Sequence, residues 1–256
     1  MKKLIILMIL FSAAPALADF TVQYSGASPY LGVNVTSSGN DGTFVTGQYK
    51  INIQGDAADI ASIIGAPGVV DVFCIDLWDW APTTSGIHYT LMPLDETPDM
   101  GAGPMGGDRA GYLATLLDTY WDADDWSSAA SRTFDSTTYT ANQVAAALQV
   151  AVWEIVDEFN TDPTGPEPIT PAGWNVTTGS GLFYISGNAA VTAIANEMLS
   201  NVVTLGMSDF GNYRGVSNTT DPSHYQDYVV RVPVPAAVLL GLLGFGAAGI
   251  KLRKQD

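Results

Sequence analysis

The 256-residue sequence is poor in cysteine and in basic residues, and both shortages limit what the protein can be. Its single cysteine, Cys74, excludes an internal disulfide framework. Residues 19–231 contain five basic and 25 acidic side chains, a net charge of about −20. A surface of this charge repels nucleic acid and anionic lipid, so we expect neither to bind it by charge attraction.

Sequence motifs of enzymes are also missing. The chain has no Gly-x-Ser-x-Gly elbow, no His-Glu-x-x-His pair, no phosphate-binding glycine loop and no Cys-x-x-Cys pair. The acidic stretch 122–125 lacks the glycine and terminal glutamate of an EF-hand calcium loop. We therefore expect no enzymatic activity, no metal site and no cofactor.

The N-terminus has the pattern of a signal peptide. Lys2 and Lys3 precede an apolar run over residues 4–11, and Ala16-Leu17-Ala18 is a small-residue cleavage site. Residues 1–18 are therefore expected to direct export and to be removed. Residues 19–231 then form the working part, which is long enough to bury a full core as a single domain. A free thiol in an exported protein is liable to oxidation, so it should be buried, paired with another chain or chemically used.

Residues 232–256 predict a membrane-anchored tail. An apolar, glycine-rich run at 238–250 is followed by the basic residues Lys251, Arg253 and Lys254, which would stop transfer and keep the C-terminus in the cytoplasm. The run is slightly short for a span of about 20 residues. We expect a transmembrane helix that first anchors the protein in the inner membrane, either as a plain anchor or as part of a sorting signal.

The order of these parts resembles the PEP-CTERM sorting signal of Gram-negative bacteria, in its Val-Pro-x-Pro-Ala variant. The matching residues are Val232, Pro233, Pro235 and Ala236, while Val234 stands where the namesake motif has glutamate. The resemblance implies recognition by an exosortase-type sorting protease. It also implies a place on the cell surface or in the extracellular matrix of a Gram-negative bacterium.

The pattern of apolar residues and turn residues predicts an α+β domain. Strands are expected at residues 20–24, 30–36, 43–54, 69–77, 87–94, 182–186 and 225–232. Helices are expected at residues 56–64, 109–120, 140–158 and 188–204, the last with Asn188 as its N-cap.

The segment 140–158 contains an unusual polar residue. Thr140 and Gln143 form a capping box, and between Val144 and Trp153 the only polar side chain is Gln149. A helix that is apolar nearly all round is buried, and an unpaired buried amide costs about 1–3 kcal/mol. Gln149 must therefore have a partner, which is either an ordinary hydrogen bond or a covalent bond to Cys74.

Two short motifs resemble the thioester domains of bacterial surface adhesins. They are the aromatic–cysteine pair Phe73-Cys74 and the segment from Gln149 to Trp153, which reads Gln-Val-Ala-Val-Trp. The family usually has threonine before this glutamine, and here Leu148 stands there. The resemblance implies a β-sheet or barrel-like core with packed helices, and a Cys74–Gln149 thioester flanked by Phe73 and Trp153. Its implied targets are amines or hydroxyls on a surface or an exopolysaccharide.

Two functions remain open from the sequence. The first is adhesion by covalent capture through the thioester, with Asp76, Glu154 and His88 as weak candidates for proton transfer. The second is a non-covalent structural protein of the surface or matrix, in which Cys74 and Gln149 are core residues.

The tail generates a first prediction. Deleting residues 251–256 should give a protein that is still exported but is wrongly retained or released, because the basic stop signal is lost. Cell fractionation and immunoblotting measure this. A truncated protein that fractionates like the full chain would contradict the anchor.

Overall fold

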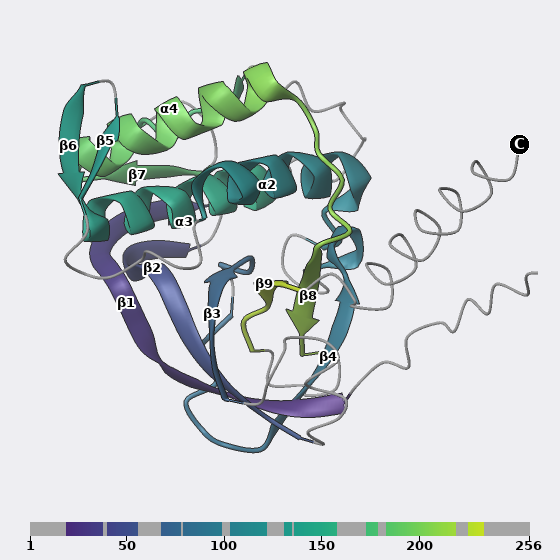
Figure 1. The fold of residues 1–256 in the computed structure, drawn as a ribbon. Helices are drawn as coiled ribbons and strands as arrows, with labels where there is room; N and C mark the ends of the chain where they lie inside the picture. The colour runs from purple at the N-terminus through teal and green to yellow at the C-terminus, as the bar shows by residue number, and fades with distance from the viewer. Residues whose placement is uncertain are drawn as a thin grey trace, which may run out of the picture.

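The computed structural model describes residues 19–37, 40–55, 68–77, 79–98, 103–121, 131–134, 136–157, 173–178, 183–218 and 225–232. Its helices are α2 (Gly106–Tyr120), α3 (Ala141–Asp157) and α4 (Ala189–Leu205), with a 3-10 turn, η1, at Leu94–Glu96. Its strands are β1 (Asp19–Ser37), β2 (Asn40–Gln54), β3 (Gly68–Cys74), β4 (Ile87–Pro93), β5 (Ser131–Phe134), β6 (Thr137–Thr140), β7 (Tyr184–Ser186), β8 (Tyr213–Ser217) and β9 (Tyr228–Arg231). The chain is α+β, as predicted (Figure 1).

Several expectations lie outside the described residues. These are the signal peptide at 1–18, the short helix at 56–64, the acidic stretch at 122–125 and the tail from residue 233 onward. The predicted transmembrane helix is therefore not part of the described fold. The helices that are described include none long and apolar enough to cross a membrane.

The main sheet closes on itself. Its order is β2-β3-β9-β8-β4-β1, and β1 also pairs with β2, so six antiparallel strands form a ring to which β7 adds at the far end of β1. The sequence predicted two strands where the structure has the single 19-residue β1. Register shifts between Tyr24 and Gly26 and between Ala27 and Tyr30 interrupt the pairing there without ending the strand. β1 is therefore long enough to pair with three strands.

The helices lie together at one end of the strands. Figure 1 shows α3 and α2 crossing above the strands, with α4 above them. Helix α3 contacts β1, β2 and β3 on one side and α2 and α4 on the other, which explains why it is apolar nearly all round. The predicted capping box is confirmed, because the Thr140 N–H donates to Gln143 Oε1 at 3.0 Å and the Gln143 N–H to Thr140 Oγ1 at 3.3 Å. The Asn188 cap of α4 is confirmed as well, since its side chain accepts from the Val191 N–H.

Sequence patterns missed the hairpin of β5 and β6 and the strand β8. Each of these strands has only four or five residues, too few for a clear alternation of polar and apolar side chains. Strand β8 exists because it fills the place between β4 and β9 and completes the ring.

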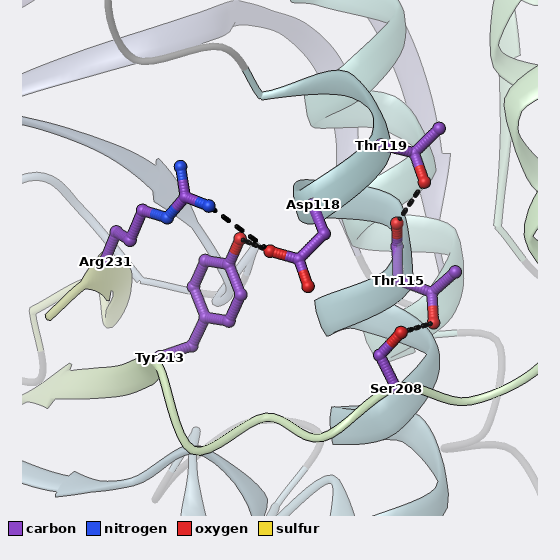
Figure 2. Close-up of polar contacts among 6 residues, drawn as sticks. All are labelled: Thr115, Asp118, Thr119, Ser208, Tyr213 and Arg231. Carbon is purple, nitrogen blue, oxygen red and sulfur yellow. Dashed lines mark hydrogen bonds and ion pairs between the residues drawn. The ribbon is translucent and has the colours of Figure 1, made fainter. Parts of the chain in front are cut away.

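A polar cluster joins α2 to the two C-terminal strands (Figure 2). The Tyr213 hydroxyl on β8 donates to Asp118 Oδ1 at 2.7 Å, and Arg231 on β9 approaches the same oxygen at 3.4 Å. Burial raises the pKa of Tyr213, and the bond to the Asp118 carboxylate raises it further, so the hydroxyl stays protonated and donates. One turn earlier, Thr115 donates to the Gly206 carbonyl at 2.7 Å and contacts Ser208. The ion pair is partly exposed and adds little by itself, but together these contacts fix α2 against the strands.

The close approach of β1 and β2 at Gly47, next to a register shift in their pairing, gives a prediction of stability. A methyl group on Gly47 would overlap the Pro29 carbonyl oxygen and lie 2.7 Å from the Tyr30 Cα, both in the backbone of β1. Gly47→Ala should therefore lower the free energy of unfolding by about 3 kcal/mol. Gly42→Ala, also on β2, meets nothing closer than Phe44 at 3.7 Å and should stay within about 1 kcal/mol of the parent. Urea denaturation measures the stability of both variants. Equal stabilities would contradict the close approach of β1 and β2 at Gly47.

Candidate functional site

The structure brings Cys74 and Gln149 together across 75 residues of sequence. Cys74 is the last residue of β3, and Gln149 lies in the middle of α3. The Cys74 N–H donates to Gln149 Oε1 at 2.9 Å, and Gln149 Nε2 donates to the Cys74 carbonyl oxygen at 2.7 Å. Both residues are completely buried. The prediction that Gln149 is buried with a partner is confirmed, and the partner is the backbone of Cys74.

The backbone of Cys74 is open to Gln149 because β2 separates from β3 before β3 ends and continues beside β1 alone. The pairing of β2 with β3 ends at Val72, whereas β9 continues along the other edge of β3 and its Asp227 carbonyl accepts from the Ile75 N–H at 3.0 Å. Successive residues of a strand point their N–H and C=O groups to opposite edges. Those of Cys74 therefore point to the edge that β2 has left. The Gln149 carboxamide carries the same donor and acceptor as a peptide group and takes the place of the missing strand.

The Cys74 thiol is neutral in this setting. Its Sγ donates to the Asp76 carbonyl oxygen at 2.9 Å. Burial raises the pKa of the thiol well above its ordinary value, and the negative charge of Asp76 raises it further. The Asp76 backbone and the Trp153 side chain lower this pKa, while Asp157 raises it, and burial prevails. A thiol with such a pKa is a weak nucleophile at neutral pH.

One face of α3 is turned to the sulfur. Gln149, Trp153 and Asp157 follow one another at intervals of four residues, so they share this face. The buried Trp153 ring packs edge-to-face between Phe44 and Phe183, with centroid distances of 6.3 and 6.5 Å. Asp157 was not among the residues predicted from the sequence. Its spacing of four residues from Trp153 and eight from Gln149 already indicated that it lies on the same helix face.

The remaining predicted residues lie less close to the sulfur. Phe73 is buried, but strand alternation turns it to the opposite face of β3, where it meets Trp121 edge-on at 5.2 Å. Glu154 accepts the Asn175 N–H at 2.7 Å and so holds the segment 173–178. The His88 side chain is exposed on β4. Of the three proton-transfer candidates, Asp76 is the one whose charge acts on the Cys74 thiol.

Tyrosine rings surround the sulfur on the strand side. Tyr228 is the residue of β9 directly opposite Cys74. Its ring lies 6.1 Å from that of Tyr49 and 6.5 Å from that of Tyr89. Burial raises the pKa of all three hydroxyls, and the adjacent Cys74 contributes to each increase. The thiol therefore faces protonated aromatic side chains in a dry environment.

The hydrogen bonds between Cys74 and Gln149 also bear on whether the thiol could react with the carboxamide. If Sγ attacked the Gln149 carboxamide, negative charge would develop on Oε1, and the Cys74 N–H already donates to that atom. In serine proteases the N–H of the nucleophilic residue is likewise part of the oxyanion hole. The same two bonds equally suit an unreactive amide that fills a strand edge. The geometry therefore accommodates both functions that the sequence leaves open.

Of the proposed sorting residues, Val232 alone is described, and its N–H donates to the Asn212 carbonyl at 2.8 Å. Pro233, Pro235, Ala236, Lys251, Arg253 and Lys254 lie outside the described residues.

Comparison of the chain with known protein families, curated proteins and solved structures gives no match.

The contact between β3 and α3 predicts an order of stabilities. Gln149→Ala strands the buried N–H and C=O of Cys74, at roughly 1–3 kcal/mol for each group. Cys74→Ala keeps both backbone bonds and removes only a small buried group, which should cost about 1–2 kcal/mol. Neither variant can form a covalent bond between residues 74 and 149. Gln149→Ala should therefore be the less stable of the two, whether or not the wild-type side chains are covalently joined. Urea denaturation measures this order, and a more stable Gln149→Ala would contradict the contact.

Proposed function

We propose that this is an exported surface or matrix protein whose Cys74 and Gln149 form an internal thioester that captures amine or hydroxyl targets covalently. The single observation that carries the proposal is the contact of the only cysteine with a fully buried glutamine 75 residues away. The proposed scaffold is that of a thioester domain, which the motifs at Phe73-Cys74 and Gln149 to Trp153 resemble.

The proposed bond forms by acyl transfer. Cys74 Sγ attacks the carboxamide carbon of Gln149, the C–S bond forms, the C–N bond breaks, and Nε2 leaves as ammonia with the thiol proton. In the later capture step an amine or hydroxyl attacks the same carbon. The C–S bond then breaks, and the proton of the target passes to the sulfur. Asp76 is the candidate for carrying protons between these groups.

The surroundings suit a stored electrophile. Complete burial of Cys74 and Gln149 keeps water from hydrolysing a thioester. Lys50 is the only lysine between residues 19 and 231, and its Nζ is paired with Asp71 at 2.6 Å. Few amines of the protein itself would therefore compete with an external target.

The proposed location follows from the two ends of the chain. The signal peptide at 1–18 would direct export, and the tail at 232–256 would hold the protein in the inner membrane until an exosortase-type protease processes it. Its targets would then lie on the surface or in the matrix of a Gram-negative bacterium, where exopolysaccharide offers hydroxyl groups.

A second candidate is a non-covalent structural protein of the same location. It is favoured by the two hydrogen bonds between the Gln149 carboxamide and the Cys74 backbone and by the raised pKa of the Cys74 thiol, which donates to the Asp76 carbonyl oxygen. In this case Gln149 only substitutes for a strand and Cys74 is an inert core residue.

Intact mass separates the two candidates. Freshly purified mature protein should weigh one ammonia less than its sequence, and methylamine should add one adduct at Gln149 while freeing the Cys74 thiol. Cys74→Ala and Gln149→Ala should each restore the calculated mass, and the double variant should behave like either one. A free, titratable Cys74 in denatured protein never exposed to amines would leave the non-covalent candidate.

A further inference from the structure

The indole N–H of Trp153 is a buried donor with an unusual environment. The side chain is completely buried, and Nε1 makes no hydrogen bond of ordinary geometry to any described residue. Buried donors are rarely left in this state, because an unsatisfied group costs about 1–3 kcal/mol. An indole N–H without a partner can donate a hydrogen bond to a negative charge that develops only during a reaction.

The position of the indole points to the sulfur of Cys74. Trp153 follows Gln149 by one turn of α3, and the Gln149 carboxamide is bonded to the backbone of Cys74. The ring packs edge-to-face against Phe44 and Phe183. The Trp153 side chain lowers the pKa of the Cys74 thiol, although burial and the charge of Asp76 keep that pKa raised.

The strength of this contact depends on the charge of the sulfur. In the resting protein the thiol hydrogen is donated to the Asp76 carbonyl, and a neutral sulfur is a weak acceptor. A thiolate is a much stronger acceptor, because hydrogen bonds to charged groups are roughly twice as strong as neutral ones. The indole N–H therefore interacts more strongly with the reacting sulfur than with the resting thiol, which is the requirement for catalysis.

We infer that Trp153 is a catalytic residue of the thioester site, whose indole N–H stabilises the negative charge on Cys74 Sγ while the thioester forms and while it is opened. This inference rests on the proposed function. In formation, the N–H stabilises the attacking sulfur as its proton moves to the leaving ammonia. In opening, it stabilises the sulfur as the electron pair of the broken C–S bond returns to it. The indole keeps its own proton throughout.

The Asp76 backbone also lowers the pKa of the Cys74 thiol, but the other side chains around the sulfur do not. Asp76 and Asp157 are negative and oppose a thiolate. The tyrosines of β2, β4 and β9 keep their protons, and each hydroxyl pKa is raised in part by Cys74; these are Tyr49, Tyr89 and Tyr228. Among these side chains, Trp153 is the one that lowers the pKa of the Cys74 thiol and so favours the charged sulfur.

The test compares two tryptophans. Trp153→Phe keeps an aromatic ring and removes the N–H. Trp174→Phe is the matched control, because its Nε1 is also buried without a hydrogen-bond partner among the described residues, while its ring packs on Tyr112 at 5.2 Å. In the mature protein, Trp153→Phe should slow methylamine incorporation roughly 10- to 100-fold, and Trp174→Phe less than about twofold. Mass spectrometry follows the adduct, and urea denaturation compares the two stabilities.

A second readout separates the role of the N–H from packing. After methylamine has opened the thioester, the pH dependence of Cys74 alkylation gives the pKa of the freed thiol. This pKa should be higher in Trp153→Phe than in Trp174→Phe. If Trp153→Phe fails to fold or to form the thioester, benzothienylalanine at position 153 replaces the N–H by sulfur with nearly the same shape, and it should show the same slow opening.

The outcomes distinguish the two proposals. Wild-type protein of full calculated mass would refute the thioester itself. A wild-type thioester combined with parental opening rates in Trp153→Phe or the benzothienylalanine variant would overturn only the role of Trp153. Equal slowing in Trp153→Phe and Trp174→Phe, with equal losses of stability, would also overturn it, because packing would then explain the effect.

Discussion

The hydrogen-bonded contact between the Gln149 carboxamide and the backbone of Cys74 is the constraint on which the site depends. β2 separates from β3 after Val72, before β3 ends at Cys74. The edge of β3 is therefore unpaired by a strand beneath a helix, where water cannot reach it. Without a partner, the N–H and C=O of Cys74 would each cost about 1–3 kcal/mol. A glutamine on an otherwise apolar helix supplies both partners at once. The contact therefore fixes the rotation and height of α3 over the sheet.

The rest of the fold holds this contact in place from several sides. The ring of six strands presents β3 between β2 and β9, and α3 lies over it beneath α4. The Asp118, Tyr213 and Arg231 cluster ties α2 to β8 and β9 (Figure 2), the strands on the far side of Cys74. The contact joins elements from opposite halves of the chain, β3 and α3.

Some of the groups around Cys74 disfavour a reactive thiolate, and others favour the charges of a thioester reaction. Burial and two carboxylates disfavour a Cys74 thiolate, and each unit of raised pKa corresponds to about 1.4 kcal/mol. The Cys74 N–H at Gln149 Oε1 and the indole of Trp153 favour the charges that a thioester reaction would generate. Burial also keeps water from the bond once it has formed. We propose that this balance gives a thioester that is slow to form and durable afterwards, and that the non-covalent alternative corresponds to the case in which burial dominates.

The sequence by itself determined the features that neighbouring residues encode. The capping box at Thr140 and Gln143, the Asn188 cap, the burial of Gln149 and the α+β class could be predicted, because capping and periodicity act over a few residues. The tertiary structure decided the rest. The continuity of β1 and the short strand β8 follow from the closure of the ring. Ring closure depends on pairing between distant strands, and the site depends on where β2 separates from β3; no local pattern in the sequence records either of these.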